Sequence, residues 1–506
     1  MPTLTRKSRR RRKITPSVVA LSPAYIQRKI PIYELLNEEE QQKLEDHADW
    51  ILAEIGIEFR GDEEALRLFK DAGATVTDTR VQFDKGHVRA LCATAPREFE
   101  MFGRNRRPVK FGGNNVVFAP AYGSPFVTDI KRGRRYGTIE DFENFVKLTH
   151  VSPWLHHQSG TLCEPVDIPV NKRHLDMVYA HLRYGDQPFM GGVTAPSRAE
   201  DSIEMARILF GEAFMTDHCV IQGNINVNSP LVYDDTMSGA LRVYAAANQG
   251  LVISPFILGG AMSPVTMPAA LAQAHAEAMV GIALSQLVQP GCPVVYGNFL
   301  TTMDLKTGAP TFGTPESSLA AQAIGQLARR LGLPFRCGGH YTASKVSDGQ
   351  AMQESADSMQ AGITAGANFI FQAAGWLEGG LSIGYEKFVM DADHCGQLQR
   401  YLHGLSLESN QLASDAFQEV GSGGNFLGAQ HTLAHFRTAN HKSDLADNDS
   451  VEQWTEDGRK DTEQRAYERW NRLLNQYEVP PLDPAIDDAL KAFIAQKKAS
   501  MPDEWY

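Results

Sequence analysis

Six aromatic side chains and one carboxylate in this sequence have the chemistry needed to bind an organic cation. The rings belong to Tyr122, Phe126, Phe299, Tyr341, Trp376 and Tyr385, and the carboxylate belongs to Glu378. An aromatic face attracts a cation that cannot donate a hydrogen bond, and each contact contributes about 0.5–2 kcal/mol. Rings around one carboxylate therefore indicate a quaternary ammonium ligand. In the alternative interpretation, single rings fill a core and the carboxylate forms a surface ion pair.

Polar candidates accompany these rings. Asn224 and Asn226 are expected to bind the other end of the ligand. His340 follows Gly338 and Gly339, whose missing side chains would let a bound molecule approach the backbone closely. At such a position a histidine can hydrogen-bond a substrate, touch a cofactor, or act as an acid or base.

The elements that must position these residues repeat eight times. Each unit is a short apolar run followed by a helix candidate, and the runs are 116–122, 155–163, 188–193, 219–225, 251–258, 293–299, 334–341 and 368–375. Apolar runs that alternate with helices predict parallel strands joined by right-handed crossovers. Eight units close into a (β/α)8 TIM barrel, so we expect an α/β fold with its active site at the carboxyl ends of the strands.

Further segments flank the predicted barrel. The expected divisions are a basic flexible arm (1–30), an N-terminal helical cap (31–115), the barrel (116–400) and a C-terminal helical extension (401–506). The extension should pack on the barrel because Trp470 needs burial. Two long segments that follow strands, 299–313 and 376–386, are expected to carry ligand chemistry.

Composition limits the possible functions. The chain has 506 residues, of which 43% are hydrophobic and 22% are charged, as is ordinary for a globular protein. Its net charge of -11 argues against nucleic-acid binding. The basic run 7–13 could be an RNA-binding arm, but it is more simply a solvated tail or a clamp on an acidic surface. Because we find neither a membrane-spanning stretch nor a signal peptide, we expect a cytoplasmic protein without membrane association.

The six cysteines are scattered singly and have no metal-ligand spacing. This pattern is typical of reduced thiols, so we predict neither a disulfide framework nor a bound metal.

Several motifs resemble the trimethylamine methyltransferase superfamily. The most specific is the segment from Gly338 to Asp391, which begins GGHYTASKVSDG and includes GWLEGGLSIGYEK. The run HTLAHFR at 431–437, the run EVPPL at 478–482 and the N-terminal arginine cluster agree with it. The resemblance covers nearly the whole chain. It implies a (β/α)8 barrel whose mouth docks a separate corrinoid protein, with a methyl group passing from an amine to the Co(I) form of that cobalamin.

The chain departs from the trimethylamine enzymes of this superfamily at one point. Those enzymes carry pyrrolysine in the barrel, whereas this chain has ordinary residues, with His340 and Tyr341 near that place. It therefore resembles the branch that includes glycine betaine:corrinoid methyltransferases. The resemblance implies that His340 and Glu378 are catalytic, that Glu378 and the rings hold the cation, and that Gly338, Gly339 and His340 touch the corrinoid.

The resulting prediction is a methyltransferase that moves a methyl group from glycine betaine, or a related quaternary amine, to a corrinoid protein. We expect a homo-oligomer. Two alternatives stay open: a betaine-binding or regulatory protein without catalysis, and a zinc-dependent methyltransferase of the methanol or thiol kind, in which the metal polarises the methyl donor. The scattered cysteines and histidines disfavour the zinc enzyme.

Overall fold

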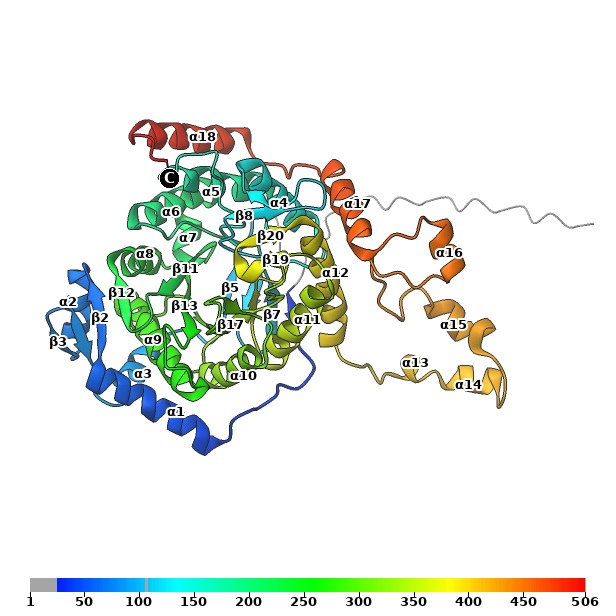
Figure 1. Ribbon diagram of the computed structural model, residues 1–506, viewed down its shortest axis with the longest axis horizontal. Helices are drawn as coiled ribbons and strands as arrows, with labels where there is room; N and C mark the ends of the chain where they lie inside the picture. The colour runs from blue at the N-terminus through cyan, green and yellow to red at the C-terminus, as the bar shows by residue number, and fades with distance from the viewer. Residues whose placement is uncertain (1–24, 105–107, 506) are drawn as a thin grey trace, which may run out of the picture.

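A curved, mainly parallel sheet surrounded by helices forms the centre of the computed structural model, which describes residues 25–104 and 108–505 (Figure 1). Its strands run in the order β1 (Ile26–Gln27), β7 (Asn115–Phe118), β18 (Phe369–Phe371), β17 (Phe335–Gly338), β14 (Val294–Gly297), β13 (Gly250–Gly259), β11 (Ile221–Val227) and β10 (Phe189–Met190). β1 is antiparallel to β7, and all other neighbours in this order are parallel.

The second predicted strand, 155–163, is not a regular strand. Its backbone nevertheless bonds to β7 and to β10: the amide of His156 donates to the carbonyl of Phe118 at 2.9 Å, and the amide of Met190 donates to the carbonyl of Ser159 at 2.8 Å. Ser159 has a φ of 64°, which interrupts an extended ladder. The structure thus shows an α/β fold with a curled sheet, and the expected complete barrel lacks a regular ladder at this run.

The helices that follow the strands cover the outer face of the sheet. They are α4 (Ile139–Val151), α5 (Arg173–Tyr184), α6 (Pro196–Phe210), α8 (Asp235–Ala246), α9 (Met267–Val288), α10 (Pro315–Arg330), α11 (Gly349–Thr364) and α12 (Tyr385–Leu402). α9 is alanine-rich and almost wholly buried because the N-terminal helices pack on its outer side. The order of strands and helices therefore directs the carboxyl ends of the parallel strands to one end of the sheet, which we call the mouth (Figure 1).

The N-terminal region packs beside α9. Its helices are α1 (Glu38–Trp50), α2 (Glu63–Asp71) and α3 (His87–Cys92). Its strands β2 (Ile57–Arg60), β3 (Thr75–Thr77) and β4 (Arg80–Gln82) form one sheet with β12 (Val232–Asp234), in the order β12, β2, β4, β3. α1 begins at a capping box in which Asn37 and Glu40 exchange side-chain and backbone hydrogen bonds. The basic run 7–13 lies outside the described residues.

A hairpin of β5 (Phe99–Met101) and β6 (Val109–Phe111) closes the end of the sheet opposite the mouth. Met101, Val109 and Phe111 are all buried, and the Phe111 ring lies 5.3 Å from that of Phe369 inside the sheet. The backbone of Met101 also bridges to Cys219, just before β11. Apolar side chains thus fill this end of the interior.

Two small groups of paired strands lie at the mouth. β15 (Phe299–Met303) extends β14 and turns back through β16 (Pro310–Thr311), where Thr302 pairs with Thr311. β19 (Trp376–Leu377), β20 (Ser382–Gly384), β8 (Phe126–Thr128) and β9 (Arg135–Tyr136) form the second sheet, in that order. These sheets carry three of the six aromatic candidates: Phe126, Phe299 and Trp376.

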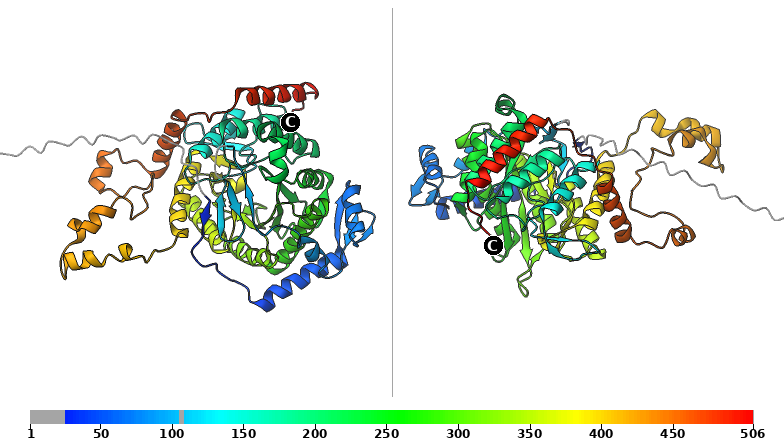
Figure 2. Two further views of the ribbon diagram at one scale, coloured as in Figure 1. Left: turned by 180° about the vertical axis from the view of Figure 1, so that it is seen from behind. Right: turned by 90° about the horizontal axis from the view of Figure 1, so that it is seen from above.

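The C-terminal region only partly packs on the body. α17 (Thr462–Asn475) packs on α12 and α4, and α18 (Pro484–Ala499) packs on α5 and α6. Between α12 and α17 the chain swings away from the body (Figures 1 and 2) through α13 (Ser409–Leu412), α14 (Ser414–Val420), α15 (Gln430–His435) and α16 (Val451–Glu456). Residues 404–442 are called the projecting arm below. Among the described residues, no helix is both long enough and apolar enough to cross a membrane.

Candidate functional site

Four aromatic rings meet at the mouth. They are Phe299 at the start of β15, Phe312 just after β16, Tyr341 after β17 and Trp376 in β19. Neighbouring ring centroids lie 5.0 to 6.1 Å apart. The indole nitrogen of Trp376 is buried and has no hydrogen-bond partner in the described structure. This ring cluster unites three predicted side chains with one that was not predicted, Phe312.

Glycines make room for the cluster. A Cβ atom on Gly338 would lie 1.8 Å from the Tyr341 ring, so this ring folds back over β17 only because position 338 has no side chain. A Cβ atom on Gly339 would lie 2.7 Å from the sulfur of Met359. Both close approaches come from the protein itself. The predicted corrinoid contact of Gly338 and Gly339 is therefore not favoured by this geometry.

Arg336 lies inside the sheet beside the ring cluster. It points inward from β17 and is 1% exposed. Its Nη1 donates to the carbonyl of Asn298 at 2.6 Å, and its Nη2 donates to the Oε1 of Gln372 at 2.7 Å. The guanidinium carbon lies 5.2 Å from the Phe299 ring and 5.1 Å from the Phe371 ring. A cationic group thus shares one ring, Phe299, with the cluster.

Polar side chains on β11 and β13 face the same interior. Asn224 is buried, and its Oδ1 has no partner among the described residues. The same holds for both side-chain amide atoms of Gln222 and for the hydroxyl of Ser254. Asn226 lies two residues further along β11, on the same face as Asn224, and is partly exposed. Such groups stay unpaired in a native interior only where water or a ligand reaches them.

Tyr122 lines the opposite side of the mouth interior. Its ring lies 5.4 Å from that of Phe371, and it borders a pocket that also touches Gly160, His181 and Met190. Burial raises the pKa of the Tyr122 hydroxyl to about 12, so the group is neutral at physiological pH. The Phe371 ring thus lies close to both Tyr122 and Arg336.

Glu378 and Phe126 both meet Arg134. The Oε2 of Glu378 accepts a hydrogen bond from the Nε of Arg134 at 2.8 Å. The guanidinium carbon of Arg134 lies 3.5 Å from the centroid of the Phe126 ring. A cation of the chain thus already occupies the carboxylate and the ring face. This geometry matches the alternative interpretation of Glu378 as a surface ion pair.

His340 lies outside the ring cluster, although Tyr341 lies in it. Its imidazole is fully buried, with Nδ1 2.7 Å from the carbonyl oxygen of Ala373 and Nε2 2.8 Å from Nδ1 of His394 in α12. Burial, then the neighbouring His394 and Lys387, hold the pKa of His340 well below its ordinary value. Both ring nitrogens are engaged within the protein, so the geometry does not favour the predicted contacts with substrate or corrinoid.

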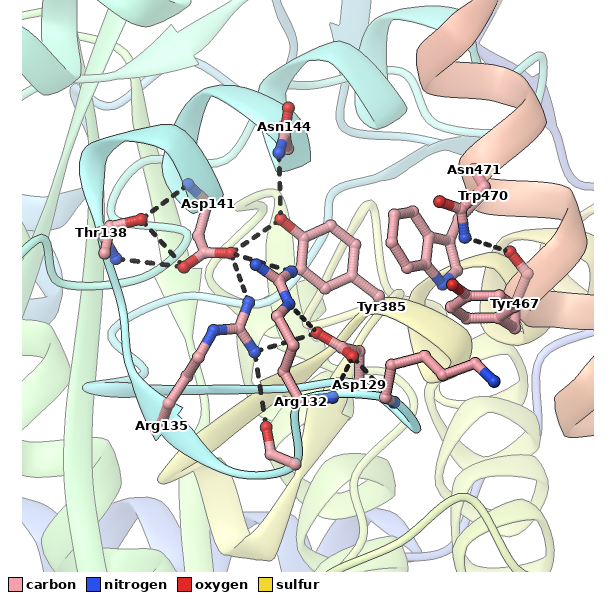
Figure 3. Close-up of polar contacts among 12 residues, drawn as sticks. Asp129, Arg132, Arg135, Thr138, Asp141, Asn144, Tyr385, Tyr467, Trp470 and Asn471 are labelled. Carbon is pink, nitrogen blue, oxygen red and sulfur yellow. Dashed lines mark hydrogen bonds and ion pairs between the residues drawn. The ribbon is translucent and has the colours of Figure 1, made fainter.

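Tyr385 is buried behind the mouth, between α12, α4 and α17 (Figure 3). Its hydroxyl donates to Asp141 at 2.9 Å and accepts from Asn144 at 3.3 Å. Its ring lies 4.5 Å from that of Trp470. Arg135 also donates to Asp141, at 2.6 Å. Tyr385 thus joins three helices, and the prediction that it binds substrate is not favoured by this position.

Two members of the site escaped sequence analysis. Phe312 lies at the far end of the long segment 299–313, and only the hairpin β15–β16 brings it back to Phe299. Arg336 could have been found from the sequence. It is a charged residue inside an apolar strand that is buried on both faces, and such a residue needs a compensating partner.

Comparisons with known proteins identify the family of the chain. The family model described as trimethylamine methyltransferase matches residues 3–502. A glycine betaine methyltransferase from Desulfitobacterium hafniense (strain Y51) is 38% identical over 477 residues, which cover 94% of this chain and 99% of that protein. A trimethylamine methyltransferase from Desulfitobacterium hafniense (strain DSM 10664 / DCB-2) is 28% identical over 452 residues, which cover 86% and 88%.

Among solved structures, the monomethylamine methyltransferase of Methanosarcina barkeri aligns with a TM-score of 0.47 and 12% identity, over 86% of this chain and 92% of that chain. The family match of nearly full length and the relative at 38% identity establish the family of this chain. The chain belongs to the trimethylamine methyltransferase family and is a methyltransferase.

Proposed function

We propose that this protein moves a methyl group from glycine betaine, or a closely related betaine, to the Co(I) corrinoid of a separate protein. The observation that carries the proposal is the cluster of four rings at the mouth, with a buried arginine beside it. The relative at 38% identity is named a glycine betaine methyltransferase, which supports the same substrate class.

The ring cluster would hold the trimethylammonium group. A quaternary nitrogen has no hydrogen-bond donor, so ring faces are its best neutral partners, and each contributes about 0.5–2 kcal/mol. Because Glu378 is already paired with Arg134, the cation would meet rings rather than a free carboxylate. Glu378 would then hold the loop 376–380 against β8 and β9.

This choice of rings suits the proposed chemistry. Co(I) supplies an electron pair that forms the new Co–C bond, while the C–N pair stays on nitrogen and a neutral tertiary amine leaves. The positive charge on nitrogen falls in the transition state, so a strongly paired carboxylate would stabilise the bound substrate more than the transition state. Rings bind the cation moderately and exclude water, and orientation supplies the remaining rate gain.

The rim of the mouth suits the docking of a corrinoid protein. Four large apolar side chains are exposed there, at fractions between 49% and 66%: Val265, Leu305, Val346 and Leu381. They follow β13, β15, β17 and β19 and so surround the ring cluster. Apolar side chains gathered at the opening of a ligand site are typical of a protein interface. The acceptor corrinoid would then reach the methyl group from above.

We also infer that the sheet is a complete (β/α)8 barrel. The run 155–160 would be its eighth strand, since its backbone bonds to Phe118 on one side and to Pro188 and Met190 on the other. All six cysteines are buried and unpaired, which fits the reducing conditions that Co(I) requires and supports a cytoplasmic location.

We infer that the projecting arm binds a second copy of this chain. It exposes eight large apolar side chains: Leu405, Leu407, Leu412, Phe417, Phe426, Leu427, Leu433 and Phe436. Together they offer on the order of 800 Å², which is the area that one partner contributes to a stable interface. Its helices have 4 to 7 residues and are too short to persist alone. The projecting arm therefore needs a permanent partner, whereas a corrinoid protein must bind at the mouth and dissociate in each reaction cycle.

The direct test combines the purified protein with Co(I) cobalamin and glycine betaine. We expect methylcobalamin, followed by its absorbance, and dimethylglycine in equal amounts. Trp376→Leu should lower kcat/KM about 10-fold through the loss of one cation–π contact. The matched control, Trp50→Leu on the exposed face of α1, should leave it unchanged.

Other outcomes separate the alternatives. Binding of betaine without any product, across a panel of betaines, would favour a regulatory protein. Stoichiometric zinc by elemental analysis, with activity lost on chelation, would favour the zinc enzyme. Equal loss of activity in both tryptophan variants would contradict the role of the ring cluster.

A further inference from the structure

Arg336 is a buried cation without a buried anion. Its two hydrogen-bond acceptors, the Asn298 carbonyl and the Gln372 amide oxygen, are both neutral. Its Nε is buried and has no partner. No carboxylate pairs with it anywhere in residues 25–104 and 108–505. Removing a guanidinium from water costs several kcal/mol. No anionic group of the described residues compensates this cost.

Arg28 shows how this chain compensates a buried guanidinium elsewhere. Arg28 is 3% exposed and donates to the carbonyls of Ile363, Gly366 and Ala367. These carbonyls lie at the C-terminal end of α11, where the helix dipole is negative. The two acceptors of Arg336, by contrast, belong to residues that lie in no helix. Its contacts with Phe299 and Phe371 hold the side chain in place without bringing negative charge.

Polar side chains face the same sheet interior as Arg336. Gln222, Asn224 and Ser254 point into the same interior from β11 and β13, and each has a buried side-chain atom without a partner. The amides and the hydroxyl can donate to oxygen atoms. Gly297, on the strand between β13 and β17, contributes no side chain, since a Cβ atom there would lie 2.0 Å from the hydroxyl oxygen of Ser254. Three strands thus carry unpaired donors, at Gln222 Nε2, Ser254 Oγ and Arg336 Nε, whereas the unpaired atom of Asn224 is the acceptor Oδ1.

We propose that Arg336 binds the carboxylate of the methyl donor, so that this site selects a zwitterion. This inference rests on the proposed function and adds the group that distinguishes a betaine from other quaternary amines. The free Nε–H and a neighbouring Nη–H form the fork that matches two carboxylate oxygens. The unpaired hydroxyl of Ser254 completes the anion site.

The spacing limits the length of the substrate. The Phe299 ring lies 5.2 Å from the Arg336 guanidinium carbon and 5.7 Å and 6.1 Å from the rings of Tyr341 and Trp376. One ring therefore borders both the anion site and the ring cluster. A carboxylate one to a few carbons from the ammonium spans this separation. The guanidinium also repels the bound ammonium, and this repulsion disappears when the amine leaves neutral.

The test compares two nearly isosteric ligands, glycine betaine and choline, which differ in the carboxylate. Calorimetry should show that the native protein binds glycine betaine at least 100-fold more tightly than choline. Arg336→Gln should weaken glycine betaine binding about 100-fold and leave choline binding within 3-fold. Arg336→Lys, which keeps the charge without the fork, should lie between. Arg28→Gln is the matched control for loss of a buried guanidinium, and it should keep the native preference.

Each outcome decides between the two proposals. Loss of preference for glycine betaine in Arg336→Gln supports the carboxylate site, even if no methyl transfer is ever observed, in which case only the proposed function fails. Equal weakening of both ligands, or no weakening of either, overturns the carboxylate site while methyl transfer by the native protein would still support the function. Thermal melts of all variants identify any that are unfolded, and Arg336→Lys then carries the comparison.

Discussion

Gly338 decides where the Tyr341 ring can lie. Gly338→Ala places a Cβ atom 1.8 Å from that ring and must displace it from Phe299 and Trp376. We expect the affinity for glycine betaine to fall at least 10-fold, because one wall of the proposed cation site moves. Calorimetry measures this change. Gly349→Ala is the control, since nothing lies within 4 Å of its added methyl group; equal affinities in the two variants would contradict the role of the ring.

Tyr385 joins helices and should not affect ligand binding. Tyr385→Phe removes the hydroxyl that donates to Asp141 and accepts from Asn144. We expect the free energy of unfolding to fall by about 1–3 kcal/mol, the usual cost of a broken buried hydrogen bond to a charged group. The dissociation constant for glycine betaine should not change.

Urea unfolding and calorimetry test both parts of this prediction. Tyr401→Phe, on the half-exposed face of the same helix, is the control and should leave stability unaltered. A weaker affinity in Tyr385→Phe at unchanged stability would restore the original prediction of a substrate-binding residue.

The structure brings some of the predicted site residues together and leaves others apart, for one physical reason. Phe299, Tyr341 and Trp376 follow strands, and the strands bring them together. His340 and Tyr385 also follow strands, yet their side chains turn into the body. The alternation of a strand fixes the direction of its own side chains. Beyond the last residue of a strand, local turns set the direction of each side chain. These turns depend on tertiary packing, which cannot be seen in the sequence.

At the scale of elements, seven of the eight predicted strands were confirmed. Each is an apolar run buried on both faces, which periodicity identifies well. The exception, 155–163, contains Ser159 at a φ of 64° and divides its backbone hydrogen bonds between two neighbours. Nothing in the residue types LHHQSGTLC distinguishes such a kinked run from a regular strand.

The projecting arm is the element whose role oligomerisation would explain. Phe417→Glu combined with Leu427→Glu places charges on two exposed apolar positions. We expect light scattering to give a multiple of 55.8 kDa for the native chain and 55.8 kDa for this variant. Charge buried at an apolar interface opposes association. Leu319→Glu, on the exposed face of α10, should not change the mass, and a native chain that stays monomeric would contradict the inference.

At the scale of the whole molecule, buried neutral histidines should make stability depend on pH. Burial lowers the pKa of His156, His157 and His275 to about 3 and that of His181 to about 4. In the unfolded chain each would titrate near its usual value of about 6.5. Below that pH the unfolded state binds more protons, so the free energy of unfolding should fall as pH falls, by up to about 1.4 kcal/mol per pH unit for each histidine.

Urea unfolding at several values between pH 7.5 and 5 measures this slope. Asp391 contributes a slope of the opposite sign. Burial raises the pKa of this carboxyl to about 6, so below that pH the folded state binds a proton that the unfolded state lacks. His275→Gln, which can still bond to the Tyr296 hydroxyl, should reduce the slope by the share of one histidine. A stability that is flat across this range would refute the prediction.

The hairpin of β5 and β6 makes the interior a blind well, because Met101, Val109 and Phe111 seal the end away from the mouth. In the proposed reaction, the methyl donor and the corrinoid acceptor must therefore both reach the site through the mouth. The betaine must enter before the corrinoid protein covers it, and dimethylglycine stays trapped until that protein departs. Turnover would then follow a compulsory order, and dissociation of the corrinoid protein would limit the rate of product release.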